Sequence, residues 1–161
     1  MIVYVDDIIL TGDDETELAA LKKRLAKKFQ IKDLGVLKYF LGMEFERSKE
    51  GIFVNQRKYV LDLLGETGLL GCKMVETPID LNLKLQLAKV EEVKDREQYQ
   101  KLVGKLIYLS HTQPDIAFAV SMVSQFMHSL GAEHFEAVYK ILRYLKGTPM
   151  RGLMFKKHGH L

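Results

Sequence analysis

The sequence predicts an α+β protein: a small antiparallel sheet of hairpins with packed helices, followed by an all-helical subdomain. Two short runs rich in β-branched residues open the chain on either side of an acidic pair, and a second pair of such runs lies between residues 37 and 54. From residue 95 onward, apolar residues recur at helical spacing, and Gly and Pro separate the segments. Strands first and helices afterwards are typical of this class.

The size and composition are those of an ordinary globular protein. The chain has 161 residues, of which 47% are hydrophobic, so one domain or two small subdomains can bury a core. The net charge of +3 is mildly basic, unlike that of a histone-like protein. The single cysteine, Cys72, excludes a disulfide framework and favours an intracellular setting, cytoplasmic or nuclear. We expect no membrane segment, because no apolar run approaches about 18 residues.

The first predicted hairpin, residues 1–11, contains Tyr4-Val5-Asp6-Asp7. Asp is depleted in strands and favoured in turns, so we expect Asp6 and Asp7 at the hairpin tip. Two adjacent carboxylates repel each other, and a divalent cation removes that repulsion. Mg²⁺ accepts one or two protein carboxylates and takes its other ligands from phosphate and water. Asp6 and Asp7 are therefore candidate metal ligands, and a plain solvated turn is the alternative.

The next two elements are predicted from apolar spacing. Residues 15–29 form a helix, whose stripe of Leu18, Leu21 and Leu25 is expected to pack on the hairpins. Its acids precede its bases, as the helix dipole favours, and a phosphate-facing role for the bases is the alternative. Residues 38–54 form the second hairpin.

The rest of the chain is predicted to be mainly helical. Asn55 caps the first of these helices. An exposed connection without clear periodicity precedes the last three, and a final strand, 152–156, has no later segment with which to pair. The four expected helices are 56–66, 95–110, 116–129 and 133–146, the last ending before Gly147 and Pro149.

Six short sequence segments resemble those of a known protein family. In order they are Tyr-Val-Asp-Asp-Ile-Ile-Leu-Thr-Gly at 4–12, Leu-Lys-Tyr-Phe-Leu-Gly-Met-Glu at 37–44, Gln-Arg-Lys-Tyr at 56–59, Leu-Val-Gly-Lys-Leu-Ile-Tyr-Leu at 102–109, Gln-Pro-Asp-Ile-Ala at 113–117 and Ile-Leu-Arg-Tyr-Leu-Lys-Gly-Thr at 141–148. Together they resemble the reverse transcriptase in the Pol polyprotein of copia-type LTR retrotransposons. The resemblance implies three regions: a partial palm with the primer-grip hairpin and the start of the thumb (1–67), a connection (68–94), and a helical thumb and connection segment (95–161).

The resemblance also implies roles for the acidic pair. Asp6 and Asp7 correspond to the second and third carboxylates of the polymerase triad, in which two Mg²⁺ ions hold the primer 3′-hydroxyl and the phosphates of the incoming nucleotide. Adjacent strand residues point to opposite faces, so we expect Asp6 to be the direct ligand.

A second group of roles concerns the primer. Leu41, Gly42 and Met43 resemble the primer grip, where Gly42 would permit close backbone approach; a strand bulge is the alternative. Lys32 lies roughly where the family places a lysine facing the leaving pyrophosphate.

The stretch from Lys140 to the end contains no Asp or Glu. We expect its cations, Lys140, Arg143 and Lys146, to contact the phosphate backbone of a primer–template duplex, and a solvated face is the alternative.

These observations favour a fragment of an RNA-directed DNA polymerase that is inert by itself. The family's fingers, first catalytic Asp and ribonuclease H domain would lie outside this sequence. Its expected partners are a primer–template duplex, nucleotides in the intact enzyme, and the missing palm and fingers segment or a second copy. The alternatives are a non-catalytic nucleic-acid-binding module and a domesticated interaction fragment.

We predict that the purified chain incorporates no nucleotide on a primed homopolymer template with Mg²⁺ or Mn²⁺, because two carboxylates without the third hold both metals poorly. A primer-extension assay tests this. Incorporation above background that disappears in Asp6→Asn would contradict it.

Overall fold

The computed structural model describes residues 1–80, 85, 95–128 and 130–157. Over these residues the chain contains five α-helices and two antiparallel sheets, which confirms the predicted α+β class. It divides into two compact units, Met1–Lys38 and Tyr39–Leu161, which are described separately. No helix in the described ranges is long and apolar enough to cross a membrane.

The first unit contains a hairpin and one helix. Strand β1 (Ile2–Tyr4) pairs antiparallel with β2 (Asp7–Ile9), and Val3 lies opposite Ile8. These β-branched pairs fit a pleated surface, and the predicted hairpin is confirmed.

Helix α1 (Glu15–Lys28) begins where the sequence predicts. The carboxylate of Asp14 caps it by accepting hydrogen bonds from the backbone N–H groups of Thr16 (2.7 Å) and Glu17 (3.1 Å). These bonds lower the pKa of Asp14. No residue of α1 is buried, and its leucine stripe is half-buried. The packing of this stripe on the hairpins stays a prediction.

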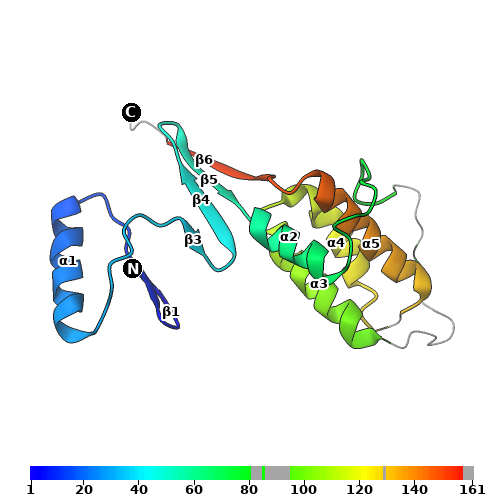
Figure 1. Ribbon diagram of the computed structural model, residues 1–161, viewed down its shortest axis with the longest axis horizontal. Coiled ribbons are helices and arrows are strands. Elements are labelled where there is room, and N and C mark those ends of the chain that lie inside the picture. The colour runs from blue at the N-terminus through cyan, green and yellow to red at the C-terminus, as the bar shows by residue number, and fades with distance from the viewer. Residues whose placement is uncertain (81–84, 86–94, 129, 158–161) are drawn as a thin grey trace. The chain divides into compact units, whose positions relative to one another are not determined.

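The second unit contains a four-stranded antiparallel sheet (Figure 1). Its order is β3 (Tyr39–Phe40), β4 (Met43–Arg47), β5 (Gly51–Asn55) and β6 (Gly152–Lys156). The second hairpin predicted over 38–54 is confirmed, because β3, β4 and β5 pair antiparallel in this range. The expectation that the last strand lacks a partner is wrong, because β6 pairs with β5 along its whole length. Strand β5 lies far from β6 in the sequence, so no local sequence pattern indicates that the two strands pair.

Two glycines allow β5 and β6 to approach. A Cβ atom on Gly152 would overlap the carbonyl oxygen of Val54, and one on Gly51 would overlap the carbonyl oxygen of Phe155. Both positions therefore require glycine because a side chain would not fit, although glycine weakens the interior of a strand.

The helical part largely follows the prediction. Its elements are α2 (Arg57–Glu66), α3 (Arg96–Ser110), the 3₁₀ turn η1 (Pro114–Ile116), α4 (Ala117–Ser124) and α5 (Ala132–Gly147). Helix α4 is shorter than expected at both ends. The N-cap of α2 is Gln56 and not the predicted Asn55, although the side-chain oxygen of Asn55 accepts the N–H of Arg57 at 3.0 Å.

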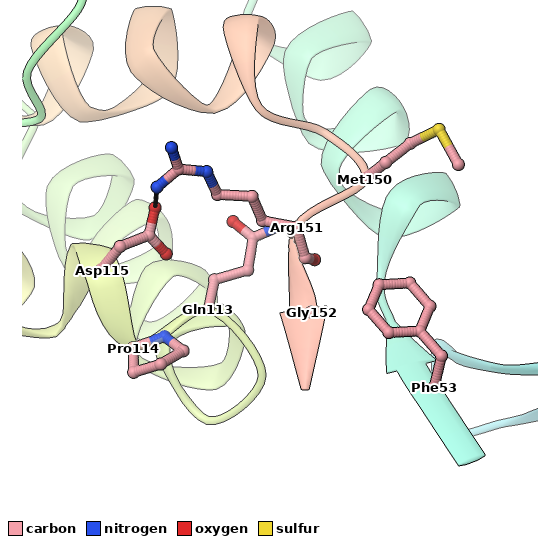
Figure 2. Close-up of a pocket in the computed structure, with 7 residues that line it drawn as sticks. All are labelled: Phe53, Gln113, Pro114, Asp115, Met150, Arg151 and Gly152. Carbon is pink, nitrogen blue, oxygen red and sulfur yellow. Dashed lines mark hydrogen bonds and ion pairs between the residues drawn. The ribbon is translucent and has the colours of Figure 1, made fainter. Parts of the chain in front are cut away.

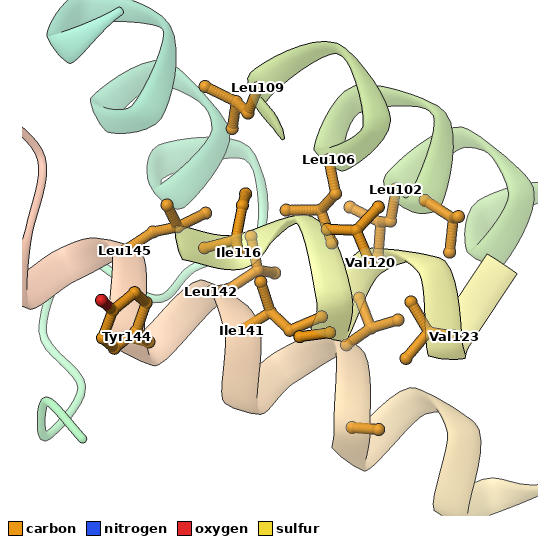
Figure 3. Close-up of a cluster of buried hydrophobic side chains, with 14 of the residues drawn as sticks. Leu102, Leu106, Leu109, Ile116, Val120, Val123, Ile141, Leu142, Tyr144 and Leu145 are labelled. Carbon is orange, nitrogen blue, oxygen red and sulfur yellow. The ribbon is translucent and has the colours of Figure 1, made fainter. Parts of the chain in front are cut away.

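One apolar core joins the four helices α2–α5 (Figure 3). Val60 and Leu63 come from α2, Leu106 from α3 and Ile141 from α5. The hydroxyl of Tyr99, buried in α3, donates to the Val123 carbonyl at 2.7 Å. The three regions that the resemblance implies, 1–67, 68–94 and 95–161, stay predictions. Residues 81–84 and 86–94 of the expected connection over 68–94 lie outside the described residues.

We predict that Gly152→Ala destabilises the second unit by roughly 1–3 kcal/mol, because its methyl group cannot fit against Val54. Urea unfolding followed by circular dichroism measures this.

Gly104→Ala is the control, since Gly104 lies in the exposed surface of α3 with no heavy atom near its absent Cβ. It should stabilise the protein by roughly 0.5–1 kcal/mol. Equal effects of the two substitutions would show that the close approach of β5 and β6 is not a constraint.

Candidate functional site

The acidic motif forms a two-residue hairpin turn. Tyr4 lies opposite Asp7, so the turn consists of Val5 and Asp6, and Asp7 begins β2. The expected tip of Asp6 and Asp7 is therefore wrong by one residue. Val5 has a φ of +49°, which is unfavourable for a β-branched side chain. The turn thus holds backbone strain directly beside the two carboxylates.

The two carboxylates are exposed and adjacent in the chain. This donor set fits Mg²⁺, which takes one or two protein carboxylates and completes its shell from phosphate and water. Among the residues that the structure describes, no group of three or more His, Cys, Asp or Glu side chains is arranged to hold a metal. Asp6 and Asp7 remain the predicted ligands.

Lys32 is exposed in the loop that follows α1. Its neighbour Asp33 ties this loop to the helix, because its carboxylate pairs with Lys22 at 2.9 Å and also accepts the N–H of Gly35 at 2.9 Å. The hydrogen bond from Lys22 lowers the pKa of Asp33. The role of Lys32 beside the pyrophosphate stays a prediction.

The predicted primer-grip residues lie at the β3–β4 turn. Phe40 is opposite Met43, so Leu41 and Gly42 form a two-residue turn, with φ values of +50° and +78°. Gly42 is therefore a turn residue and not a strand bulge. A Cβ there would make only ordinary contacts, the closest at 3.4 Å to Tyr59, so the requirement for glycine is conformational.

Two tyrosines from different helices support this turn. The Tyr108 hydroxyl of α3 donates to the Leu41 carbonyl. The Tyr108 and Tyr59 rings meet edge to face, with centroids 5.4 Å apart and planes at 68°. Burial raises the pKa of Tyr59.

Further contacts fix the strands on either side of the turn. Glu44 of β4 accepts the backbone N–H of Lys58 at 2.9 Å, and the Lys58 ammonium lies 5.7 Å from the centre of the Tyr39 ring. Beside them, the buried side chain of Gln56 accepts a hydrogen bond from Thr112 at 2.6 Å. The hairpin is thus attached to the start of α2 and the end of α3.

The three predicted phosphate-contacting cations on α5 are half-buried. Lys140 forms an ion pair with Asp80, and Lys146 donates to the carbonyl of Cys72. The Nε of Arg143 is buried and has no hydrogen-bond partner in the described part of the chain. A duplex would therefore compete with internal partners for Lys140 and Lys146, and their role on nucleic acid stays a prediction.

A polar cluster that the sequence analysis missed lies where the chain leaves α5 (Figure 2). The Asp115 carboxylate accepts hydrogen bonds from Tyr144 (2.6 Å) and Arg151 (2.7 Å). Gln113 donates to the Arg151 carbonyl at 3.2 Å. Phe53 and Met150 complete a pocket of about 400 Å³ in front of this cluster. No signal in the sequence pairs Arg151 with Asp115.

Contacts within the second unit link five of the six sequence segments that carry the family resemblance. Contacts link 37–44 to 102–109 through Tyr108, 56–59 to the end of α3 through Gln56, and 113–117 to 141–148 through Tyr144.

Comparison with known proteins places these observations in a family. Residues 1–81 match the family model described as reverse transcriptase (RNA-dependent DNA polymerase). No solved structure matches the chain.

Several curated proteins are similar over most of the chain. The retrovirus-related Pol polyprotein from transposon RE1 of Arabidopsis thaliana is 45% identical over 157 residues, covering 98% of this chain and 11% of the polyprotein. The polyprotein from transposon TNT 1-94 of Nicotiana tabacum is 40% identical, covering 92% and 12%. An uncharacterized mitochondrial protein of Arabidopsis thaliana is 38% identical over 161 residues, covering 100% and 67%. The chain thus spans only about a tenth of the polyproteins it matches.

We predict that the free energy of unfolding falls as the pH rises above 10. Burial and the hydrogen bond to Asp115 raise the pKa of Tyr144, and burial raises that of Tyr99, from the ordinary value of 10.0. A raised pKa in the folded state gives stability that is complete below the ordinary value and is lost as the pH rises toward the folded value. Urea unfolding at pH 8–11 measures the effect.

Tyr144→Phe should cost about 1 kcal/mol at pH 8 through its lost hydrogen bonds, and should make the alkaline decline less steep. The control Tyr39→Phe removes a hydroxyl from a residue that is 51% exposed and should leave the slope unchanged. If the free energy of unfolding declines equally steeply with pH in the unmodified chain and in both variants, Tyr144 does not contribute to the alkaline decline.

Proposed function

The chain belongs to the reverse transcriptase (RNA-dependent DNA polymerase) family, and from this premise we propose that it is the part of a copia-type retrotransposon polymerase that carries two catalytic carboxylates and the primer grip. Asp6 and Asp7 are the carboxylates, and Leu41, Gly42 and Met43 are the grip. The match of residues 1–81 to the family model supports both assignments, since that range contains both turns.

One observation favours these assignments most. Among the described residues, the non-glycine residues with positive φ are Val5 and Leu41. Each lies in one of the two turns to which the proposal gives a role in catalysis. Side chains in such conformations cost roughly 1–3 kcal/mol and are concentrated at functional sites, where the surrounding structure maintains them.

The proposed mechanism uses few groups of this chain. Bound Mg²⁺ would supply charge neutralisation for the nucleotide phosphates and orientation of the primer 3′-hydroxyl. Asp6, in the turn of the first hairpin, and Asp7, at the start of β2, would hold the metal. The β3–β4 turn would fix the position of the primer end, so that the hydroxyl lies in line with the phosphate that it attacks.

We further propose that the 161-residue chain is catalytically inert alone. The curated polyproteins are much longer, and the remaining palm and the fingers would come from such a longer protein or from a separately supplied segment.

The second candidate is a non-catalytic nucleic-acid-binding module. The second unit has its own core of four helices, and α5 presents three cations within two turns. This function does not require Asp6 and Asp7 to bind a metal. The exposed apolar side chains of the first hairpin favour a third candidate, an interaction fragment; they include Ile2 (55%), Val3 (60%) and Val5 (80%).

We predict weak, sequence-independent binding of a primed duplex, with a dissociation constant in the range of roughly 10⁻⁴ to 10⁻⁶ M. Counterion release drives such binding, so the log–log dependence on salt has a slope of about −0.9 per phosphate contacted. Fluorescence anisotropy of a labelled duplex at several salt concentrations measures both quantities.

The combined reversal Lys140→Glu, Arg143→Glu and Lys146→Glu should weaken binding more than the pair Asp6→Asn and Asp7→Asn. The proposed role of the two carboxylates is to bind metal, whereas the three cations would contact the phosphates of the duplex. A circular dichroism spectrum controls for the lost pairing with Asp80. If binding at low salt is absent or is unchanged by the reversal, both the phosphate role of α5 and the binding-module candidate are excluded.

A further inference from the structure

We propose that the Tyr108 hydroxyl is the positioning group that maintains the Leu41–Gly42 turn in the conformation that contacts the primer end. The inference rests on the proposed function for its primer role. Tyr108 lies outside the range that matches the family model, in helix α3, 67 residues beyond Leu41. It acts through the turn and is not itself a catalytic residue.

The turn requires an external support because Leu41 is in the left-handed region. Its φ of +50° places the Cβ atom too close to the following carbonyl oxygen, a conformation that Gly and Asn adopt far more readily than Leu. A two-residue turn with both φ values positive favours Asn-Gly, and Leu41-Gly42 lacks the first of these residues. The local sequence therefore opposes the observed conformation of Leu41.

The hairpin itself offers little resistance to a change in this turn. Strand β3 has two residues, so the ladder beside the turn consists of the pairs Tyr39–Glu44 and Phe40–Met43. The contacts of Lys58 with Glu44 and Tyr39 reach the strands rather than the turn.

Tyr108, by contrast, contacts the backbone of the turn itself. Its hydroxyl donates to the carbonyl of Leu41, the residue with the unfavourable φ. Its ring edge lies 3.8 Å from the position of a Cβ on Gly42, and the ring is packed against Tyr59. Because α3 is part of the buried core, this hydrogen bond joins the turn to the core of the second unit.

The test compares Tyr108→Phe with the matched control Tyr99→Phe. Both substitutions remove one hydroxyl from α3 that donates to a backbone carbonyl, but Tyr99 donates to Val123, away from the turn. Hydrogen exchange by mass spectrometry reports on residues 40–44. Anisotropy compares the affinity for a duplex with a recessed 3′ end and for a blunt duplex of the same length.

We expect Tyr108→Phe to accelerate exchange at 40–44 roughly five-fold, the effect of losing one hydrogen bond, and to reduce the preference for the recessed end toward one. Tyr99→Phe should change neither. Adding Leu41→Asn to Tyr108→Phe should restore slow exchange at 40–44, because Asn tolerates the left-handed conformation without support.

Unchanged exchange at 40–44 in Tyr108→Phe, or an equal acceleration in Tyr99→Phe, would overturn the proposal. If the unmodified chain does not prefer the recessed end, the proposed primer grip is wrong. The exchange measurement then still decides whether Tyr108 positions the turn, so the two failures are distinguishable.

Discussion

The burial of one apolar face from each of α2, α3, α4 and α5 in a single core determines where the other parts of the second unit lie. Leu106 and Leu109, near the end of α3, are completely buried in it, so this end of the helix is packed against the other helices. From that end, Tyr108 reaches the β3–β4 turn and Thr112 reaches Gln56 at the start of α2. A local site is thus built by non-local packing.

The two hairpin turns illustrate different ways to maintain strain. The turn at Leu41 is joined to a helical core by a hydrogen bond and by aromatic packing. The turn at Val5 belongs to a unit in which α1 has no buried residue. Conformations that cost energy persist where the surroundings compensate for them. By this criterion, contacts within the second unit compensate for the unfavourable φ of Leu41. Fewer such contacts are available to Val5 within the first unit.

The elements could be predicted from the sequence, but most contacts between them could not. Apolar spacing identified the helices and hairpins, because periodicity is a local property. The predicted position of the acidic turn is wrong by one residue, because Val5 and Ile8 on either side of the Asp6-Asp7 pair suit strands in either register. The pairing of β6, the Asp115–Arg151 ion pair and the support of Leu41 by Tyr108 join distant segments, and no local pattern indicates them. The family resemblance assigned roles to single residues and said nothing of what holds them.

The pairing of β5 with β6 also has a consequence for how the chain is made. Ribosomes add roughly 5–20 residues per second, so β6 is synthesised at least several seconds after β5. During that interval one edge of β5 has free N–H and C=O groups, while α2 and the helices after it are still being made. An unpaired edge is where strands from other chains can add. The nascent protein therefore passes through a period of exposure to misassembly that ends only when Gly152–Lys156 arrives.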